Sequence, residues 1–179
     1  DLLPLLEAAR RAGREIVTIA VAHAQMPFMY GGAELAPESF DFLLENPRYD
    51  ATLFCPPNGQ LASVDHAIGL HASALVRDGG TLQIGIGELG DALCYALLLR
   101  HQQNQAWTQA LHDVGTERSG APLVDAAGGR EPFRDGLFGS TEMFADQMLD
   151  LHRTGILRRR VYDSLPLSRL IASGQAGDR

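Results

Sequence analysis

The chain has 179 residues, of which 45% are hydrophobic and 21% charged, a composition that supports a packed core and argues against global disorder. Its formal net charge of -7 argues against nucleic acid as the main partner, because phosphate contacts require a basic face. No apolar stretch approaches the ~20 residues that span a bilayer, so a membrane partner is not expected either.

The first third of the chain predicts two helices and two strands. Apolar residues recur at helical spacing in 2–12 and 37–45. Short runs with few polar residues, at 15–22 and 51–55, are typical of buried strands. The Pro-Pro-Asn-Gly turn at 56–59 is the predicted boundary between two lobes.

The rest of the chain continues the alternation of helix and strand. We expect a helix at 63–76, a strand at 81–86, a helix at 89–111, a surface excursion at 115–134, a helix at 143–153 and a disordered tail at 173–179. This order predicts the α/β class, with an open, mainly parallel sheet flanked by helices.

A glycine-rich loop follows the strand at 81–86. Residues 85–90 read Gly-Ile-Gly-Glu-Leu-Gly and so satisfy G-x-G-x-x-G between a strand and a helix. Such a loop lets the backbone approach a ligand closely, and the helix start offers free N–H groups to an anion. A nicotinamide dinucleotide site is one interpretation, although the acidic residue that it needs about 20 residues later is missing. A tight turn without a ligand is another.

Three segments, in the right order, carry a resemblance to a known family. They are residues 68–87 (IGLHASALVRDGGTLQIGIG), the loop Gln25-Met26-Pro27 with Gly31 or Gly32 after it, and Ser140-Thr141-Glu142-Met143-Phe144-Ala145-Asp146. These segments resemble the "DG-x-TLQ-x-GIG", "QMP…G" and "H-[ST]-E-M-x-[SA]-D" motifs of the acetyl-CoA hydrolase/transferase family. That family belongs to the class I CoA-transferases, and the resemblance implies a NagB/RpiA/CoA-transferase-like fold.

The resemblance implies a set of site residues. Glu142 takes the position of the family's catalytic nucleophile. The backbone of Gly85, Ile86, Gly87 and Glu88 would form the oxyanion and CoA-binding loop, and Gln25, Met26 and Pro27 would line the substrate pocket. The expected partners are coenzyme A, as acyl-CoA, and a small carboxylic acid, and assembly into a homo-oligomer is left open. No metal is expected, since His23, His66, His71 and His152 lack metal-ligand spacing.

Some features depart from the family pattern. Ser140 replaces the usual His, Gly90 stands where Pro is common, and the spacing from Gly87 to Glu142 is long. The family's later glycine-rich loop is not found. We therefore expect a partial chain, with 1–58 as the end of an N-terminal lobe and 59–172 as the start of the lobe that carries the catalytic glutamate.

The chemistry of CoA exchange suits a carboxylate nucleophile, which divides one difficult step into two. We expect Glu142 at the start of a helix, and ordinary helix capping by Thr141 and Glu142 is the alternative interpretation. Asp146 would share its helical face. The two cysteines, Cys55 and Cys94, form no CxxC pair, which fits a reducing, cytoplasmic setting. The expected activity is CoA transfer or acetyl-CoA hydrolysis, as in acetate metabolism; an NAD-dependent oxidoreductase and a non-catalytic module are the alternatives.

Overall fold

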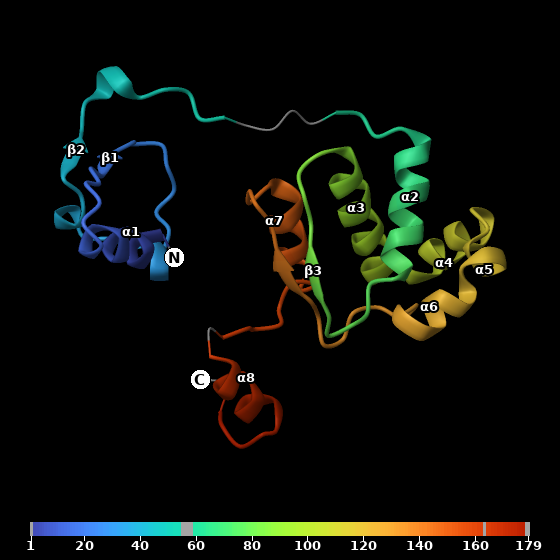
Figure 1. The fold of residues 1–179 in the computed structure, drawn as a ribbon. Coiled ribbons are helices and arrows are strands. Elements are labelled where there is room, and N and C mark those ends of the chain that lie inside the picture. Colours follow the sequence, from blue (N-terminus) through green and yellow to red (C-terminus); the bar gives the residue numbers. More distant parts are fainter. Residues whose placement is uncertain (1, 55–58, 163, 178–179) are drawn as a thin grey trace. The chain divides into compact units, whose positions relative to one another are not determined.

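Figure 1 shows the computed structural model of the chain, which describes residues 2–54, 59–162 and 164–177. The chain divides into two compact units, Asp1–Cys55 and Pro56–Arg179. The predicted boundary turn at 56–59 lies, apart from Gly59, outside the described residues. No helix of the described ranges is both long and apolar enough to cross a membrane.

The first unit contains helix α1 (Leu2–Arg11) and a two-stranded parallel sheet of β1 (Ile19–Val21) and β2 (Phe42–Leu44). Ile19 pairs with Phe42, and Val21 pairs with Leu44. Three short 3-10 turns complete the unit: η1 (Gly31–Ala33), η2 (Pro37–Ser39) and η3 (Pro47–Tyr49).

Asp41 explains why the helix predicted over 37–45 is wrong. Its carboxylate accepts hydrogen bonds from the N–H of Thr18 at 2.7 Å and from the Thr18 hydroxyl at 2.8 Å. Arg10 adds an ion pair at 2.6 Å. These bonds hold the chain beside β1, so residues 42–44 pair as a strand instead of continuing the turn of η2. Residues 51–54 form no strand, and Cys55 lies outside the described residues.

The second unit places two parallel strands among helices. Its elements are α2 (Ser63–Ala74), β3 (Thr81–Gln83), α3 (Glu88–Gln102), α4 (Asn104–Asp113), α5 (Thr116–Ser119), α6 (Ala121–Ala127), β4 (Phe138–Ser140), α7 (Asp146–Arg153) and α8 (Leu165–Ala172). The predicted α/β class with parallel strands and flanking helices is confirmed, although each sheet has two strands among the described residues. Residues 173–176 form a turn hydrogen-bonded back to α8, and the last two residues of the predicted tail lie outside the described ranges.

Two apolar clusters hold this unit together. The first joins β3, α3, β4 and α7 through Ile84, Cys94, Leu97, Phe133, Leu137, Met148, Leu151 and Ile156. The second joins α2, α4 and α6 through Ala74, Trp107, Leu111 and Val124. The predicted surface excursion at 115–134 is therefore wrong in part, because Val124 and Phe133 are buried. The helix predicted over 89–111 is broken at Gln103 into α3 and α4.

Glycine allows α2 and α3 to approach closely. A Cβ atom added at Gly69 would lie 2.5 Å from the carbonyl oxygen of Ala92, a distance that real Cβ atoms do not show. Any side chain at Gly69 would separate the helices. The glycine is therefore a packing requirement, which periodicity alone does not reveal.

Arg100 is the most unusual core residue, with 1% of its surface exposed. Its guanidinium donates hydrogen bonds to the carbonyl oxygens of Ser73, Val76 and Glu131. It also lies 4.4 Å from the ring centroid of Phe133, in cation–π geometry. Desolvation lowers the pKa of Arg100 to about 10, so the group stays charged at neutral pH. Arg100 thus ties the end of α2 to the segment that leads into β4.

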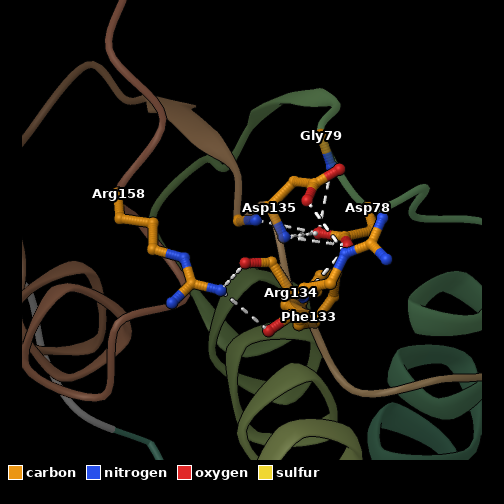
Figure 2. A network of polar contacts seen from close by, with 7 residues as sticks. Asp78, Gly79, Phe133, Arg134, Asp135 and Arg158 are labelled. Atoms are coloured by element: carbon orange, nitrogen blue, oxygen red, sulfur yellow. Dashed lines mark hydrogen bonds and ion pairs between the residues drawn. The ribbon is translucent and has the colours of Figure 1, made fainter.

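A carboxylate fixes the start of β4 in a similar way (Figure 2). Asp78 accepts backbone hydrogen bonds from Gly79, Arg134, Asp135 and Gly136, at distances of 2.8–3.1 Å. Desolvation raises the pKa of Asp78, but these N–H donors outweigh it and leave the pKa below its usual 3.8. Arg158 closes the other side by donating to the carbonyl oxygens of Phe133 and Arg134. The register between β3 and β4 is set at this end.

Candidate active site

The parallel pairing of β3 and β4 brings the glycine loop and the glutamate motif to one edge of the sheet. Gln83 pairs with Ser140, and the Ile84 N–H donates to the Ser140 carbonyl at 2.9 Å. Gly85 and Glu142 each lie two residues beyond this pair. Ligands bind at the carboxyl ends of parallel strands in open α/β sheets, so both residues occupy the expected location for a site.

Glu142 lies against Gly85. A Cβ atom added at Gly85 would be 3.6 Å from Oε1 of Glu142, which is ordinary van der Waals contact. The Glu142 side chain is exposed, so its carboxylate is accessible to a ligand that approaches this edge. The structure thus brings together the predicted nucleophile and the predicted glycine loop.

The loop between β3 and α3 offers hydrogen-bond donors beside this carboxylate. Within the described ranges, no hydrogen bond uses the N–H of Gly85, Ile86 or Gly87 as donor. Gly87 has φ of 110°, a conformation that favours glycine, and it caps the N-terminus of α3. The positive end of the α3 dipole adds to the attraction for negative charge. A developing oxyanion at this point would meet unsatisfied donors.

Glu88, the first residue of α3, also carries a carboxylate at this edge. Its Oε1 would lie 2.9 Å from a Cβ atom added at Gly59, so the side chain packs against that glycine. Desolvation, and then the charge of Glu88, raise the pKa of Asp91 one turn further along. The first turn of α3 therefore holds two interacting acidic side chains.

Gly90 is a steric requirement of the glycine loop, and its contact could not be predicted from the sequence. A Cβ atom at Gly90 would overlap the carbonyl oxygen of Gly85. The absence of a side chain lets the Gly85 carbonyl rest on the first turn of α3, which fixes the direction of the peptide beside Glu142. The motif G-x-G-x-x-G marked this glycine, but only the structure gives its contact.

The chain around Glu142 differs from the expectation at one point. Helix α7 begins at Asp146, so Glu142 lies in a bend before the helix rather than in its first turn. The prediction that Glu142 and Asp146 share a helical face is therefore wrong. The Thr141 hydroxyl instead donates to the Met143 carbonyl at 2.8 Å, across the glutamate. The apolar Phe144 that follows is exposed and starts no helical turn.

Gln25, Met26 and Pro27 belong to the first unit. They form a turn after β1, where the Gln25 N–H donates to Nδ1 of His23 at 3.2 Å. All three are exposed, and Met26 retains 59% of its surface. The site described above consists of residues of the second unit alone.

The run Arg158–Arg160 lies near the start of β3, at the end of the sheet opposite Glu142. Arg159 donates to the carbonyl oxygen of Gly80 at 3.3 Å and contacts the Thr81 hydroxyl, at the start of β3. Glu142 follows the opposite end of the pair. Two of these arginines are thus bound to the framework rather than to the glutamate edge. In the described part of the chain, no group of three or more His, Cys, Asp or Glu residues is placed to hold a metal.

A dinucleotide site would need a further strand after α3, whose end supplies an acidic residue to the ribose. The chain continues instead from Gln102 through Gln103 into α4. The glycine loop therefore lacks the second half of a dinucleotide-binding unit in this region.

No family model matches the chain. Its sequence is 32% identical over 93 residues to the succinyl-CoA:cyclohexane-1-carboxylate CoA transferase of Geobacter metallireducens, which is 52% of this chain and 20% of that protein. It is also 32% identical over 88 residues to the 4-hydroxybutyrate coenzyme A transferase of Clostridium kluyveri, or 49% of this chain and 19% of that protein. This chain is a relative of the CoA-transferases over about half of its length.

The solved structures add a shared fold. The structure of a RipA mutant matches the present chain with a TM-score of 0.50 and 21% identity, over 78% of this chain and 24% of that chain. The region matched to the two curated relatives spans about a fifth of their length. The CoA-transferase part of the expected family is thus confirmed.

Proposed function

We propose that the protein transfers CoA between carboxylic acids, with Glu142 as the carboxylate that carries CoA between them. The contact between Glu142 and Gly85, beside three N–H groups without acceptors, is the observation that carries this proposal. Kinship with CoA-transferases over half of the chain supports the reaction class.

The proposed reaction begins when a Glu142 oxygen attacks the thioester carbonyl of an acyl-CoA. The carbon–sulfur bond breaks, CoA leaves as a thiolate, and a mixed anhydride joins the acyl group to Glu142. The thiolate then attacks the glutamyl carbonyl of the anhydride and releases the first carboxylate, which leaves a glutamyl-CoA thioester. A second carboxylate reverses these two steps. Each step exchanges one anionic leaving group for another, so no net proton transfer is required.

Negative charge develops on a carbonyl oxygen in every one of these steps. The N–H groups of Gly85, Ile86 and Gly87, with the start of α3 behind them, are suited to receive it. One well-placed donor to an oxyanion contributes about 3–4 kcal/mol to transition-state stabilisation. Glu142 follows β4 while the donors follow β3, so nucleophile and oxyanion site come from neighbouring strands.

The acid partners follow from the relatives only as hypotheses. One curated relative is named for succinyl-CoA and cyclohexane-1-carboxylate, and the other for 4-hydroxybutyrate. Succinate, the acid of succinyl-CoA, and acetate, which the first resemblance implied, complete a panel of four candidate acids. If water replaces the acceptor in the last stage, the same glutamyl thioester is hydrolysed, so the transferase and hydrolase activities differ only in the final nucleophile.

The experiment that tests the proposal is chemical trapping of the intermediate. The protein at its full encoded length is treated with acyl-CoA and then with borohydride, which reduces a thioester to an alcohol. Peptide mass spectrometry is expected to find the reduced residue at position 142. Omitting acyl-CoA should abolish the modification.

Two variants sharpen the result. Glu142→Gln should lose both the modification and CoA transfer, because an amide is a far weaker nucleophile than a carboxylate. Asp146→Asn, four residues later at the start of α7, is the matched control and should keep both. Modification of a different residue, or transfer that survives in Glu142→Gln, would contradict the assignment.

A further inference from the structure

The bend that carries Glu142 has little regular structure to hold it. Pairing with β3 fixes the chain up to Ser140, and helix α7 begins at Asp146. The residues between them belong to no helix or strand. The direction of the Glu142 side chain therefore depends on local contacts in this short segment.

One hydrogen bond crosses the bend. The hydroxyl of Thr141 donates to the carbonyl oxygen of Met143 at 2.8 Å, so it links the residues on either side of Glu142. In the described part of the chain, no other hydrogen bond joins these two sides. Thr141 is itself half-buried directly after β4, where the strand restrains its backbone, and its β-branched side chain has few rotamers.

We propose that Thr141 is a positioning residue that holds the Glu142 carboxylate against the glycine loop; this role rests on the function proposed above. The hydroxyl holds the Met143 carbonyl on one side of Glu142, and pairing of β4 with β3 fixes the chain up to Ser140 on the other. The carboxylate then stays beside Gly85, where its Oε1 is 3.6 Å from a Cβ atom built at that residue. Loss of the hydroxyl releases the bend without removing the nucleophile.

The expected effect is on the chemical step. A displacement of about 1 Å in a reacting group lowers the rate by up to about a hundredfold, and the loss of one of several restraints costs less. Thr141→Val keeps the shape of the side chain and removes the hydroxyl, whereas Thr141→Ser keeps the hydroxyl. We expect Thr141→Val to form the glutamyl-CoA adduct about tenfold more slowly, and Thr141→Ser to stay within about twofold of the parent protein.

The test measures adduct formation in single turnover, kcat and KM for acyl-CoA, and the thermal midpoint of each variant in the full-length protein. A positioning role predicts a fall in kcat with an unchanged KM, restored by serine, at a thermal midpoint close to that of the parent. Thr141→Ala is the second variant without the hydroxyl, in case valine prevents folding.

The outcomes separate this role from the function on which it depends. If the parent protein forms no adduct on Glu142, the proposed function is wrong and the positioning role falls with it. If the parent forms the adduct and Thr141→Val or Thr141→Ala forms it equally fast, the positioning role alone is overturned. Equal losses in the serine and valine variants would also overturn it, because serine retains the donor.

Discussion

Gly85 and Glu142 occupy equivalent positions just after two neighbouring parallel strands, two residues beyond the Gln83–Ser140 pair. A Cβ atom built at Gly85 would be in van der Waals contact with Oε1 of Glu142, so the glutamate side chain lies against the glycine. The register of β3 against β4 therefore determines whether Glu142 and the glycine loop meet. A slip of one residue would move one side chain to the other face of the sheet.

Enlarging Gly85 should displace the glutamate in proportion to the side chain added. Alanine places its methyl group at an ordinary distance of 3.6 Å from Oε1 of Glu142, whereas valine adds two methyl groups that reach further. We expect Gly85→Val to slow formation of the Glu142 adduct by tenfold or more, on the order of the penalty for a misplaced group, and Gly85→Ala to slow it less. Quenching the reaction at successive times and quantifying the adduct by mass spectrometry gives the rate for each variant. Equal rates of adduct formation in Gly85→Val and Gly85→Ala would contradict the contact between Gly85 and Glu142.

Replacing Gly90 by alanine should destabilise the start of α3, although alanine is normally the better helix former. In an exposed helix interior, alanine is more stable than glycine by about 1 kcal/mol. At Gly90 the new methyl group overlaps the Gly85 carbonyl, and overpacking of this kind costs about 1–3 kcal/mol. Urea unfolding of Gly90→Ala should therefore show a lower free energy of unfolding. Leu89→Ala, at an exposed neighbour, is the control, and a more stable Gly90→Ala protein would refute the overlap.

Arg100 should be intolerant of substitution by methionine. Methionine fills much of the same volume but leaves the carbonyl oxygens of Ser73, Val76 and Glu131 without their donor. Buried polar groups without partners cost about 1–3 kcal/mol each, so a loss of at least about 2 kcal/mol is expected in chemical unfolding. Arg100→Lys should recover only part of the lost stability, because one ammonium group cannot reproduce the planar hydrogen-bonding geometry of the guanidinium. The same change at exposed Arg77 serves as the comparison, and similar losses at both sites would be inconsistent with this role.

Asp78 should make stability depend on pH in the acid range. Its folded-state pKa is lower than its usual value of 3.8, after backbone N–H donors outweigh desolvation. A lowered folded pKa contributes stability that is present above the unfolded pKa and is lost as the pH falls through the folded pKa. Asp78→Asn should be less stable than the parent at neutral pH, by about 1 kcal/mol, because hydrogen bonds to a charged group contribute more than those to a neutral one. The gap should narrow below about pH 4.

The control for Asp78 is Asp135→Asn, which removes an exposed carboxylate from the neighbouring loop before β4. Its effect on the free energy of unfolding should be small at every pH, because exposed ion pairs contribute little. Urea titrations at a series of pH values compare the two variants. A gap for Asp78→Asn that does not change with pH would show that the carboxylate charge is not the cause.

The sequence predicted those elements of the fold that depend on local apolar spacing and glycine placement. The helix at 63–76, the strand at 81–86 and the glycine loop after it were visible in apolar spacing and glycine placement, and α2 and β3 lie within the predicted ranges. The helical spacing at 37–45 failed because a tertiary contact decided the outcome. Asp41 is bound to Thr18 and Arg10, and the apolar run at 42–44 then pairs with β1.

The residues of the candidate site were predicted from sequence motifs, but several of their contacts were not. Motif order indicated Glu142 and the residues at 85–88, and the parallel register brings Gly85 to the glutamate. The contacts of Gly90 and Thr141 could not be inferred, because a glycine that accommodates a carbonyl and a hydroxyl that spans a bend leave no periodic signal. The burial of Arg100 was likewise invisible, since its acceptors are backbone oxygens rather than acidic partners.

The two ends of helix α3 serve different purposes, one next to the candidate site and the other in the folding core. It starts beside the glycine loop at Glu88, and buried Arg100 lies twelve residues later, roughly 18 Å away at the rise of an α-helix. Thermostability could therefore be engineered around Arg100 with little effect on the proposed CoA-transfer site near Gly85. Directed evolution of new substrates could work at the other end of the helix and keep its folding framework intact.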